Sequence, residues 1–175
     1  MPVLEPISPQ KVEAFKATRL QALYDSPGAF GSTYAREFQL SDADWLKRAH
    51  EWNNSRCVGY LAMDREKPCG IAASFLDEEN LLQAQLVSMW VAPSHRRAGL
   101  GWTLIAAILE WAHQNGALAL HLTVTSNNHP AIAFYERHGF AKTGKTLPYP
   151  NDPHLFEYEM ARPVTIESSF SPVPL

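Results

Sequence analysis

The spacing of hydrophobic residues predicts a strand and two helices in the first fifty residues. A short apolar stretch ends at Ser8-Pro9, an N-cap residue followed by a proline that suits the first turn of a helix. We expect this helix to end at the turn-forming run 25–28. A loop to about residue 40 follows, and Ser41 and Asp44 then form a capping box that opens a second short helix.

Strand patterns replace the helical spacing after about residue 56. Three apolar runs, at 58–63, 70–76 and 81–91, are separated by short polar breaks and predict an antiparallel meander. Helical spacing returns at Gly99 and is expected to end at Gly116. The strand before this helix and the strand after it predict a βαβ unit, whose ligand would sit at the carboxyl end of the first strand.

Helices and strands continue to alternate in the last third of the chain. We expect a strand over 118–125, a helix over 128–138, and two further strands over 140–145 and 155–160. Together with the first half, this order of elements predicts an α+β fold.

The length of the chain favours a single domain. A chain of 175 residues leaves little room for a second core, and no stretch inside it has the composition of a linker. We therefore expect one domain over residues 1–162. The remaining segment, 163–175, contains three prolines and is expected to form a loosely ordered tail.

Composition and charge exclude several classes of function. The 15 Lys and Arg residues against 18 Asp and Glu give a net charge of -3, so we expect neither a nucleic-acid nor a membrane partner. The seven histidines follow no zinc-binding spacing, and no metal is expected. Cys57 and Cys69, in a chain whose start lacks a leader pattern, predict free thiols and a cytoplasmic protein.

One glycine motif has the spacing of a nucleotide-binding P-loop. Residues 139–146 match the pattern G-x-x-x-x-G-K-[ST] in full. A P-loop needs a strand before it and a helix after it, so that helix amides face the phosphates. Here a predicted helix precedes Gly139, and Pro148 and Pro150 prevent a helix from following. The order of elements therefore disfavours a nucleoside triphosphatase.

A second glycine motif, Arg96 to Gly101, lies between a predicted strand and a predicted helix. Glycines at 99 and 101 let the backbone approach a bulky anion, and the paired arginines add positive charge. Taken alone, the hexapeptide fits a solvated basic turn better than a phosphate site. It is not a dinucleotide fingerprint, because Leu104 stands where the third glycine belongs.

This motif combines with two others into the pattern of a known family. Met89 to Pro93 supplies the strand end, Arg96 to Gly101 opens the long helix, and Asn128 to Phe140 gives an Asn-x-x-Ala helix that contains a tyrosine and ends in Gly-Phe. The combination resembles the GCN5-related N-acetyltransferase (GNAT) family over roughly residues 3–162. The resemblance implies a mixed central sheet, splayed at the cofactor site with helices on both faces.

The resemblance also implies a cofactor and a set of residues that hold it. Proteins of this family transfer the acetyl group of acetyl-CoA to a primary amine. Their pyrophosphate lies on the amides after the strand, and the pantetheine arm runs beside the strand end. The cofactor-binding residues implied here are Met89, Trp90, Val91, Arg96, Arg97, Ala98, Gly99, Leu100, Gly101, Trp102, Asn128, Ala131 and Phe134.

Amine acetylation needs proton transfers that side chains must support. An alkylammonium is not nucleophilic until it loses a proton, and the thiolate leaves more easily if it gains one. Tyr135 is the candidate general acid. The family often places a glutamate on the central strand, but this chain has none between Asn80 and Val91. Glu37, or a water oriented by Gln85 or Ser88, is left as the candidate base, beside direct binding of neutral amine.

The acceptor is expected to enter between the irregular segments 25–40 and 147–154. Aromatic faces and carboxylates in these segments suit a protonated amine, whether a small molecule or a peptide. The candidate substrate-binding residues are Phe30, Tyr34, Glu37, Asp152 and Tyr149. A non-catalytic acyl-CoA-binding sensor remains the alternative, and the sequence leaves a monomer and a homodimer equally open.

Overall fold

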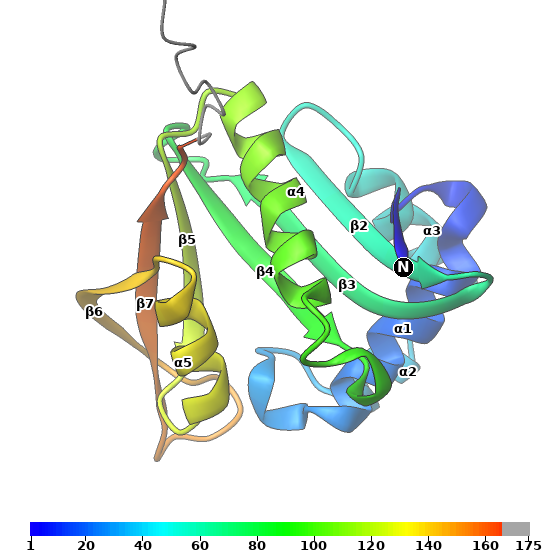
Figure 1. Cartoon of the computed structure of the whole chain (residues 1–175). Helices are drawn as coiled ribbons and strands as arrows, with labels where there is room; N and C mark the ends of the chain where they lie inside the picture. Colours follow the sequence, from blue (N-terminus) through cyan, green and yellow to red (C-terminus); the bar gives the residue numbers. More distant parts are fainter. Residues whose placement is uncertain (166–175) are drawn as a thin grey trace, which may run out of the picture.

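The computed structural model describes residues 1–165 as a seven-stranded mixed sheet with helices on both faces (Figure 1). The strands run in the order β1-β2-β3-β4-β5-β7-β6, and only β4 and β5 pair in parallel. The predicted α+β fold is therefore confirmed. The strands are β1 (Val3–Pro6), β2 (Cys57–Asp64), β3 (Lys67–Leu76), β4 (Gln83–Val91), β5 (Ala119–Thr125), β6 (Ala141–Pro148) and β7 (Phe156–Pro163).

The helices divide between the two faces of the sheet. In Figure 1, α4 and α5 cover one face, whereas α1, α2 and α3 lie behind it on the other. Short 3-10 turns precede α1, α2 and α4. The helical elements are η1 (Pro9–Lys11), α1 (Val12–Asp25), η2 (Pro27–Ala29), α2 (Tyr34–Phe38), α3 (Asp42–Glu51), η3 (Pro93–His95), α4 (Leu100–Gln114) and α5 (His129–Arg137).

Local signals in the sequence determine most helix ends. Ser41 and Asp44 form the predicted capping box, in which each side chain bonds the other residue's backbone N–H. Gly116 and Gly139 follow α4 and α5 with φ of 81° and 84°, a left-handed conformation that glycine adopts without steric cost. Between these ends, α4 buries Leu104 and Ile108, worth about 2 kcal/mol each.

The structure departs from the predicted elements in two segments. The expected loop 25–40 contains η2 and α2, because Thr33 accepts a hydrogen bond from the Arg36 amide and caps a short helix. The ordered sheet also extends past residue 162, since β7 continues to Pro163 and the Val164 amide donates to the Leu118 carbonyl. The rest of the predicted tail, from 166 to 175, lies outside the described residues.

The sheet opens between its two parallel strands. β4 and β5 pair only through residues 83–85 and 119–121, after which β5 continues paired to β7 alone. A bulge in β4 follows, where Ser88 has a φ of 56° and the register against β3 shifts. The edge of β4 beyond Gln85 therefore faces β5 without a ladder between them.

Candidate active site

The loop between β4 and α4 presents backbone amides at the start of a long helix. Arg97 and Gly99 both have left-handed backbone angles, with φ of 62° and 83°. Leu100 is buried and anchors the first turn of α4, whose N–H groups have no partner inside the helix. Outward-turned amides at a helix start favour anions such as phosphate. The loop thus has the backbone shape that a phosphate site needs.

Arg96 and Arg97 differ in their contacts, although we expected both to add positive charge for a phosphate. The Arg96 Nε donates to the Val91 carbonyl at 2.9 Å, and its Nη2 donates to Asp25. Asp25 also accepts the Trp90 indole N–H at 2.9 Å. Partial burial raises the pKa of Asp25, but the bonds from Trp90, Ser26 and Arg96 outweigh it and lower that pKa. Arg96 and Trp90 thus connect the loop to the end of α1, although the Arg96 side chain stays partly exposed. Arg97 is exposed as well and has no such bond within the described residues.

Three predicted cofactor residues meet across the opening of the sheet. A Cβ atom on Gly101 would lie 3.0 Å from the Phe134 ring and 3.5 Å from Cε of Met89. This brings the first turn of α4, the middle of α5 and the bulged strand β4 together. Asn128 lies at the start of α5, where its side chain caps the helix by accepting from the Ala131 amide at 3.3 Å. Asn128 therefore has a structural use, whatever else it contacts.

Tyr135 lies on α5, packed between aromatic rings. It is 8% exposed, and its ring meets Phe134 and Phe140 edge-on at centroid distances of 5.4 and 5.5 Å. Burial raises the pKa of Tyr135 far above that of a free tyrosine. The hydroxyl consequently keeps its proton at neutral pH, as a proton donor must.

Glu37 is an ion-pair partner rather than a free base. It is 2% exposed, and its carboxylate accepts from Arg19 at 2.8 and 3.1 Å and from Arg48 at 3.1 Å. Burial raises the pKa of Glu37, but the contacts with Arg19 and Arg48 outweigh that effect and lower it. Both oxygens already carry guanidinium partners, so the expected base role does not fit this geometry.

The other candidates for orienting water also have partners. The Ser88 hydroxyl accepts from Arg19 at 3.3 Å, and the Gln85 amide lies 3.5 Å from the Asp77 carboxylate. Ser88, Arg19 and Glu37 line a pocket of about 470 Å³ between the sheet and helices α1 and α3. Because Ser88 is one of its lining residues, the pocket lies beside the β4 bulge.

The two segments expected to flank the acceptor are bonded to each other. The Tyr149 hydroxyl donates to the Phe30 carbonyl at 2.9 Å, and the Asn151 side chain does the same at 2.9 Å. Phe30 and Tyr149 are both buried, so their rings are not the open aromatic faces that we expected. Tyr34 is exposed and stacks on Phe38 at 5.4 Å. Asp152 caps its own turn by accepting from the His154 amide.

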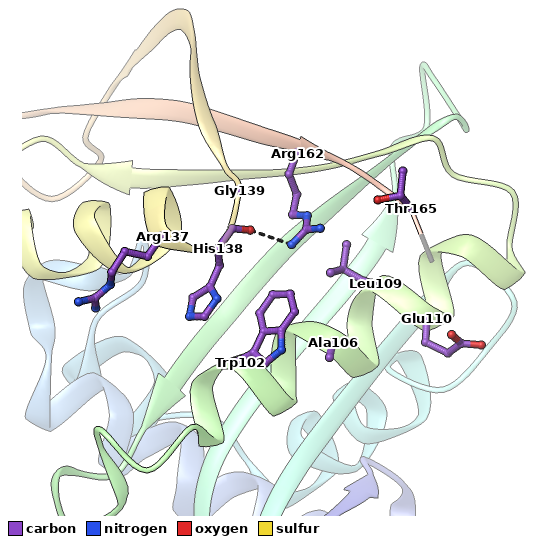
Figure 2. Close-up of a pocket in the computed structure, with 9 residues that line it drawn as sticks. All are labelled: Trp102, Ala106, Leu109, Glu110, Arg137, His138, Gly139, Arg162 and Thr165. Carbon is purple, nitrogen blue, oxygen red and sulfur yellow. Dashed lines mark hydrogen bonds between the residues drawn. The ribbon is translucent and has the colours of Figure 1, made fainter. Parts of the chain in front are cut away.

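A pocket of about 440 Å³ lies between α4, the end of α5 and the end of β7 (Figure 2). Trp102 and His138 stack along one side of it, with ring centroids 4.6 Å apart and planes within 9°. Arg162 lies over the Trp102 ring and donates to the His138 carbonyl at 2.7 Å. Of the residues that line this pocket, the sequence predicts a cofactor contact for Trp102 but not for Arg137, His138 or Arg162. The only sequence signal for these residues is that Arg137 and His138 directly follow Tyr135-Glu136.

The P-loop alternative is excluded by the structure. Residues 141–148 form β6, an exposed edge strand that pairs with β7, and no helix follows Gly139 within the described chain. Among residues 1–165, no group of His, Cys, Asp and Glu has the arrangement of a metal site. Over the same range, no helix is both long and apolar enough to cross a bilayer.

Comparison with known sequences identifies relatives among acetyltransferases. The chain is 31% identical over 105 residues to N-acetyltransferase family 8 member 7 of Mus musculus, a match that covers 58% of this chain and 46% of that protein. It is 46% identical over 54 residues to streptothricin acetyltransferase of Streptomyces lavendulae, covering 31% and 29%. The chain thus spans about half or less of the length of these relatives.

Comparison with solved structures and family models agrees. An acetyltransferase of the GNAT family from Streptococcus pneumoniae superposes with a TM-score of 0.79 at 20% identity, covering 94% of this chain and all of that one. At that identity, the likeness shows a shared fold. The model of the acetyltransferase (GNAT) family matches residues 20–140, more than half of the chain. The chain therefore belongs to the GNAT acetyltransferase family.

Proposed function

We propose that the protein transfers the acetyl group of acetyl-CoA to a primary amine by direct attack of the amine on the thioester. The observation that carries this proposal is the opening between β4 and β5, directly followed by the amide-rich start of α4. An unpaired strand edge can hold an extended amide-containing arm, and the helix start can hold its phosphates. The donor of the GNAT family, acetyl-CoA, has both an amide-containing arm and phosphates.

The donor lies along three parts of the site. Its pyrophosphate contacts the amides of residues 97–102, and its pantetheine arm pairs with the open edge of β4 at 89–91. Met89 and Phe134, in contact range around Gly101, line the arm. The adenosine end lies toward the Trp102–His138 stack, where aromatic planes suit a base and the exposed Arg137 suits a phosphate.

The reaction passes through a tetrahedral oxyanion. A backbone N–H at the β4 bulge, at Met89 or Trp90, stabilises this negative charge at the point where the ladder is broken. The C–S bond then breaks, and Tyr135 donates its hydroxyl proton to the departing thiolate. The high pKa of the buried Tyr135 keeps that proton available, although it also makes Tyr135 a weak acid that depends on close contact with sulfur.

The acceptor is a primary amine carried by a small molecule or a peptide. Both kinds appear among the relatives by name. Streptothricin acetyltransferase is one, and the alanine N-acetyltransferase of ribosomal protein bS18 from Escherichia coli, 34% identical over 81 residues, is the other. Both cysteines of this chain are free, which suits a reducing cytoplasm.

Calorimetry with acetyl-CoA, CoA and ATP tests the donor, and a thiol assay of CoA release tests the transfer. We expect acetyl-CoA and CoA to bind and ATP alone to bind far more weakly. Incubation with 1,4-diaminobutane, L-lysine and an alanyl peptide is expected to release CoA with at least one of them. Binding of acetyl-CoA without release of CoA from any amine would favour a sensor, and no binding of acetyl-CoA would contradict the proposal.

A further inference from the structure

Four polar side chains form a strip on one face of the strand pair β5–β7. Residues directly opposite in an antiparallel pair share a face, and the register pairs Thr123 with Glu159 and Thr125 with Glu157. The intervening residues Leu122, Val124 and Met160 belong to the buried core that also contains α5. We use the name polar strip for four of the residues on the opposite face: His121, Thr123, Glu157 and Glu159.

The polar strip adjoins the opening of the sheet, on the face that carries α1 and α2. His121 pairs with Gln85, the last β4 residue before the two strands separate. At the other end, Thr125 donates to the Gly28 carbonyl of η2 at 2.8 Å, which places Glu157 level with the α1–α2 connection. A molecule that approaches the β4 bulge from this face would therefore pass beside the strip.

His121 has an unsatisfied nitrogen aimed into the strip. His121 is 9% exposed, and its Nδ1 makes no hydrogen bond within the described residues. Glu159 Oε1 lies 3.8 Å from this nitrogen, too far for a direct hydrogen bond. A buried polar atom without a partner costs about 1–3 kcal/mol, so a further polar group is expected at this position.

Glu157 is the carboxylate of this region that lacks a cation. Within the described residues it forms no ion pair, and its only side-chain partner is the Thr123 hydroxyl at 3.5 Å. Burial raises the pKa of Glu157, whereas the contact with Thr123 lowers it to a smaller extent. Charged groups withdrawn from water normally have a partner of opposite charge. An unpaired, half-buried carboxylate thus fits a cationic ligand.

Two other glutamates near the opening already have cationic partners. Glu37 is held by Arg19 and Arg48, and Glu159 accepts from Thr143 at 2.8 Å and lies 3.6 Å from the Lys145 ammonium. The charged and titratable groups that share the face of Glu157 are Glu159 on β7, His121 on β5 and Lys145 on β6. Of these three glutamates, only Glu157 forms no ion pair within the described residues.

Resting on the proposed function, we infer that the acceptor's ammonium group binds at the polar strip and that Glu157 takes the proton which its nitrogen must lose before attack. The strip then selects alkylammonium acceptors that carry no carboxylate beside the amine. An α-carboxylate would lie against Glu157 and Glu159, and like charges repel. A diamine such as 1,4-diaminobutane is therefore preferred over an α-amino acid.

The proton balance of the step is closed. The ammonium nitrogen loses one proton to Glu157, forms the C–N bond, and the C–S bond breaks after the tetrahedral state. The second proton lost by nitrogen replaces the one that Tyr135 gives to the thiolate. Glu157 returns its proton to solvent, so the products are the acetamide, CoA and one proton. Because the pKa of Glu157 is raised, the difference in pKa between this carboxyl group and the ammonium is smaller, which favours the proton transfer.

The test compares Glu157→Gln with Glu66→Gln, a matched change at an exposed glutamate of the β2–β3 turn. With 1,4-diaminobutane and acetyl-CoA at pH 7.5, we expect kcat/KM to fall about 100-fold for Glu157→Gln and to stay unchanged for Glu66→Gln. The loss should shrink as pH rises toward 10, because neutral amine then replaces the need for a base. Glu157→Asp should restore part of the rate, and circular dichroism should show all three variants folded.

Two outcomes separate this inference from the proposed function. If the parent releases CoA but Glu157→Gln retains its kcat/KM at every pH, the inference is overturned and the proposed function stands. If no amine releases CoA, the proposed function fails on that panel, and NMR decides the inference. The carboxyl ¹³C titration of Glu157 must then move to lower pH when 1,4-diaminobutane is added, and an unmoved titration overturns it.

Discussion

Gly101, in the first turn of α4, lies beside side chains of β4 and α5. From the sequence, a side chain here is expected to block the approach of a phosphate. In the structure, the atom nearest to an added Cβ belongs to the Phe134 ring, 3.0 Å away. The packing of the protein alone therefore requires a small residue at this position.

A valine at this position tests the close approach. We expect Gly101→Val to push Phe134 aside, lower the free energy of unfolding by about 1–3 kcal/mol and weaken acetyl-CoA binding at least tenfold. Urea denaturation and calorimetry measure the two effects. Gly28→Ala is the control, because an added Cβ there meets nothing within 4 Å. Parent-like binding by a folded Gly101→Val protein would mean that the donor passes elsewhere.

Replacing the Tyr135 hydroxyl tests whether this residue donates a proton or only packs in the core. We expect Tyr135→Phe to reduce kcat by about 10- to 1000-fold while the Kd for acetyl-CoA changes less than twofold, since only a proton donor is removed. Tyr60→Phe, at a half-buried tyrosine of β2 whose pKa burial also raises, should leave kcat unchanged. Equal kcat for Tyr135→Phe and the parent, with chemistry rate-limiting, would make Tyr135 a packing residue.

At the scale of elements, Glu37 connects three helices. It lies on α2, accepts from Arg19 on α1 and Arg48 on α3, and is almost completely buried. A helix of five residues has little stability of its own, because nucleation costs more than so few hydrogen bonds return. The ion pairs therefore position α2 more than its local sequence does.

Removing the charge of Glu37 should loosen this connection in a pH-dependent way. We expect Glu37→Gln to lower the free energy of unfolding by about 3 kcal/mol at pH 7, because Arg19 is left buried without its counter-charge. The folded-state pKa of Glu37 is lowered, so its contribution is complete above the unfolded value near 4.3 and is lost as pH falls through the folded value. Urea titrations of both proteins at pH 7 and below pH 4 should therefore converge in acid, and a constant difference would contradict the assignment.

At the scale of the whole molecule, the two parts of the sheet are joined by few contacts. Three residue pairs link β4 to β5, and beyond them the β6–β7 turn reaches the α1–α2 connection through Tyr149 and Asn151. Those side-chain bonds close the far end of the opening in the sheet.

Loss of one hydroxyl should weaken that closure. Tyr149→Phe removes the bonds to the Phe30 and Pro27 carbonyls, and we expect Tm to fall by about 2–6 °C. Amide exchange should accelerate in segments 27–33 and 149–155 and stay unchanged in α4. Tyr24→Phe, at a tyrosine that is 77% exposed, serves as the control. Unchanged exchange in both segments would show that other contacts hold them.

The order of elements could be predicted from the sequence because its causes are local. The capping box at Ser41, the glycines after α4 and α5, and the periodic apolar positions act within a few residues of each other. The same local logic rejected the P-loop, since the prolines after Thr146 prevent the helix it requires. The predicted cofactor site, by contrast, came from the resemblance of two sequence motifs to those of the GNAT family.

The partners of charged side chains were decided only by the tertiary structure. Asp25 and Arg96 lie 71 residues apart in sequence, and the fold alone brings them into contact. Arg19 forms an ion pair with Glu37, whereas Glu157 has no cationic partner within the described residues. The sequence contains 15 basic and 18 acidic residues and does not show which of them pair. The two charged groups of an ion pair must lie within about 4 Å of each other. No local sequence pattern shows which of the many charged residues will meet this condition. Periodicity and capping therefore determined the elements, whereas long-range packing decided which side chains remain free to do chemistry.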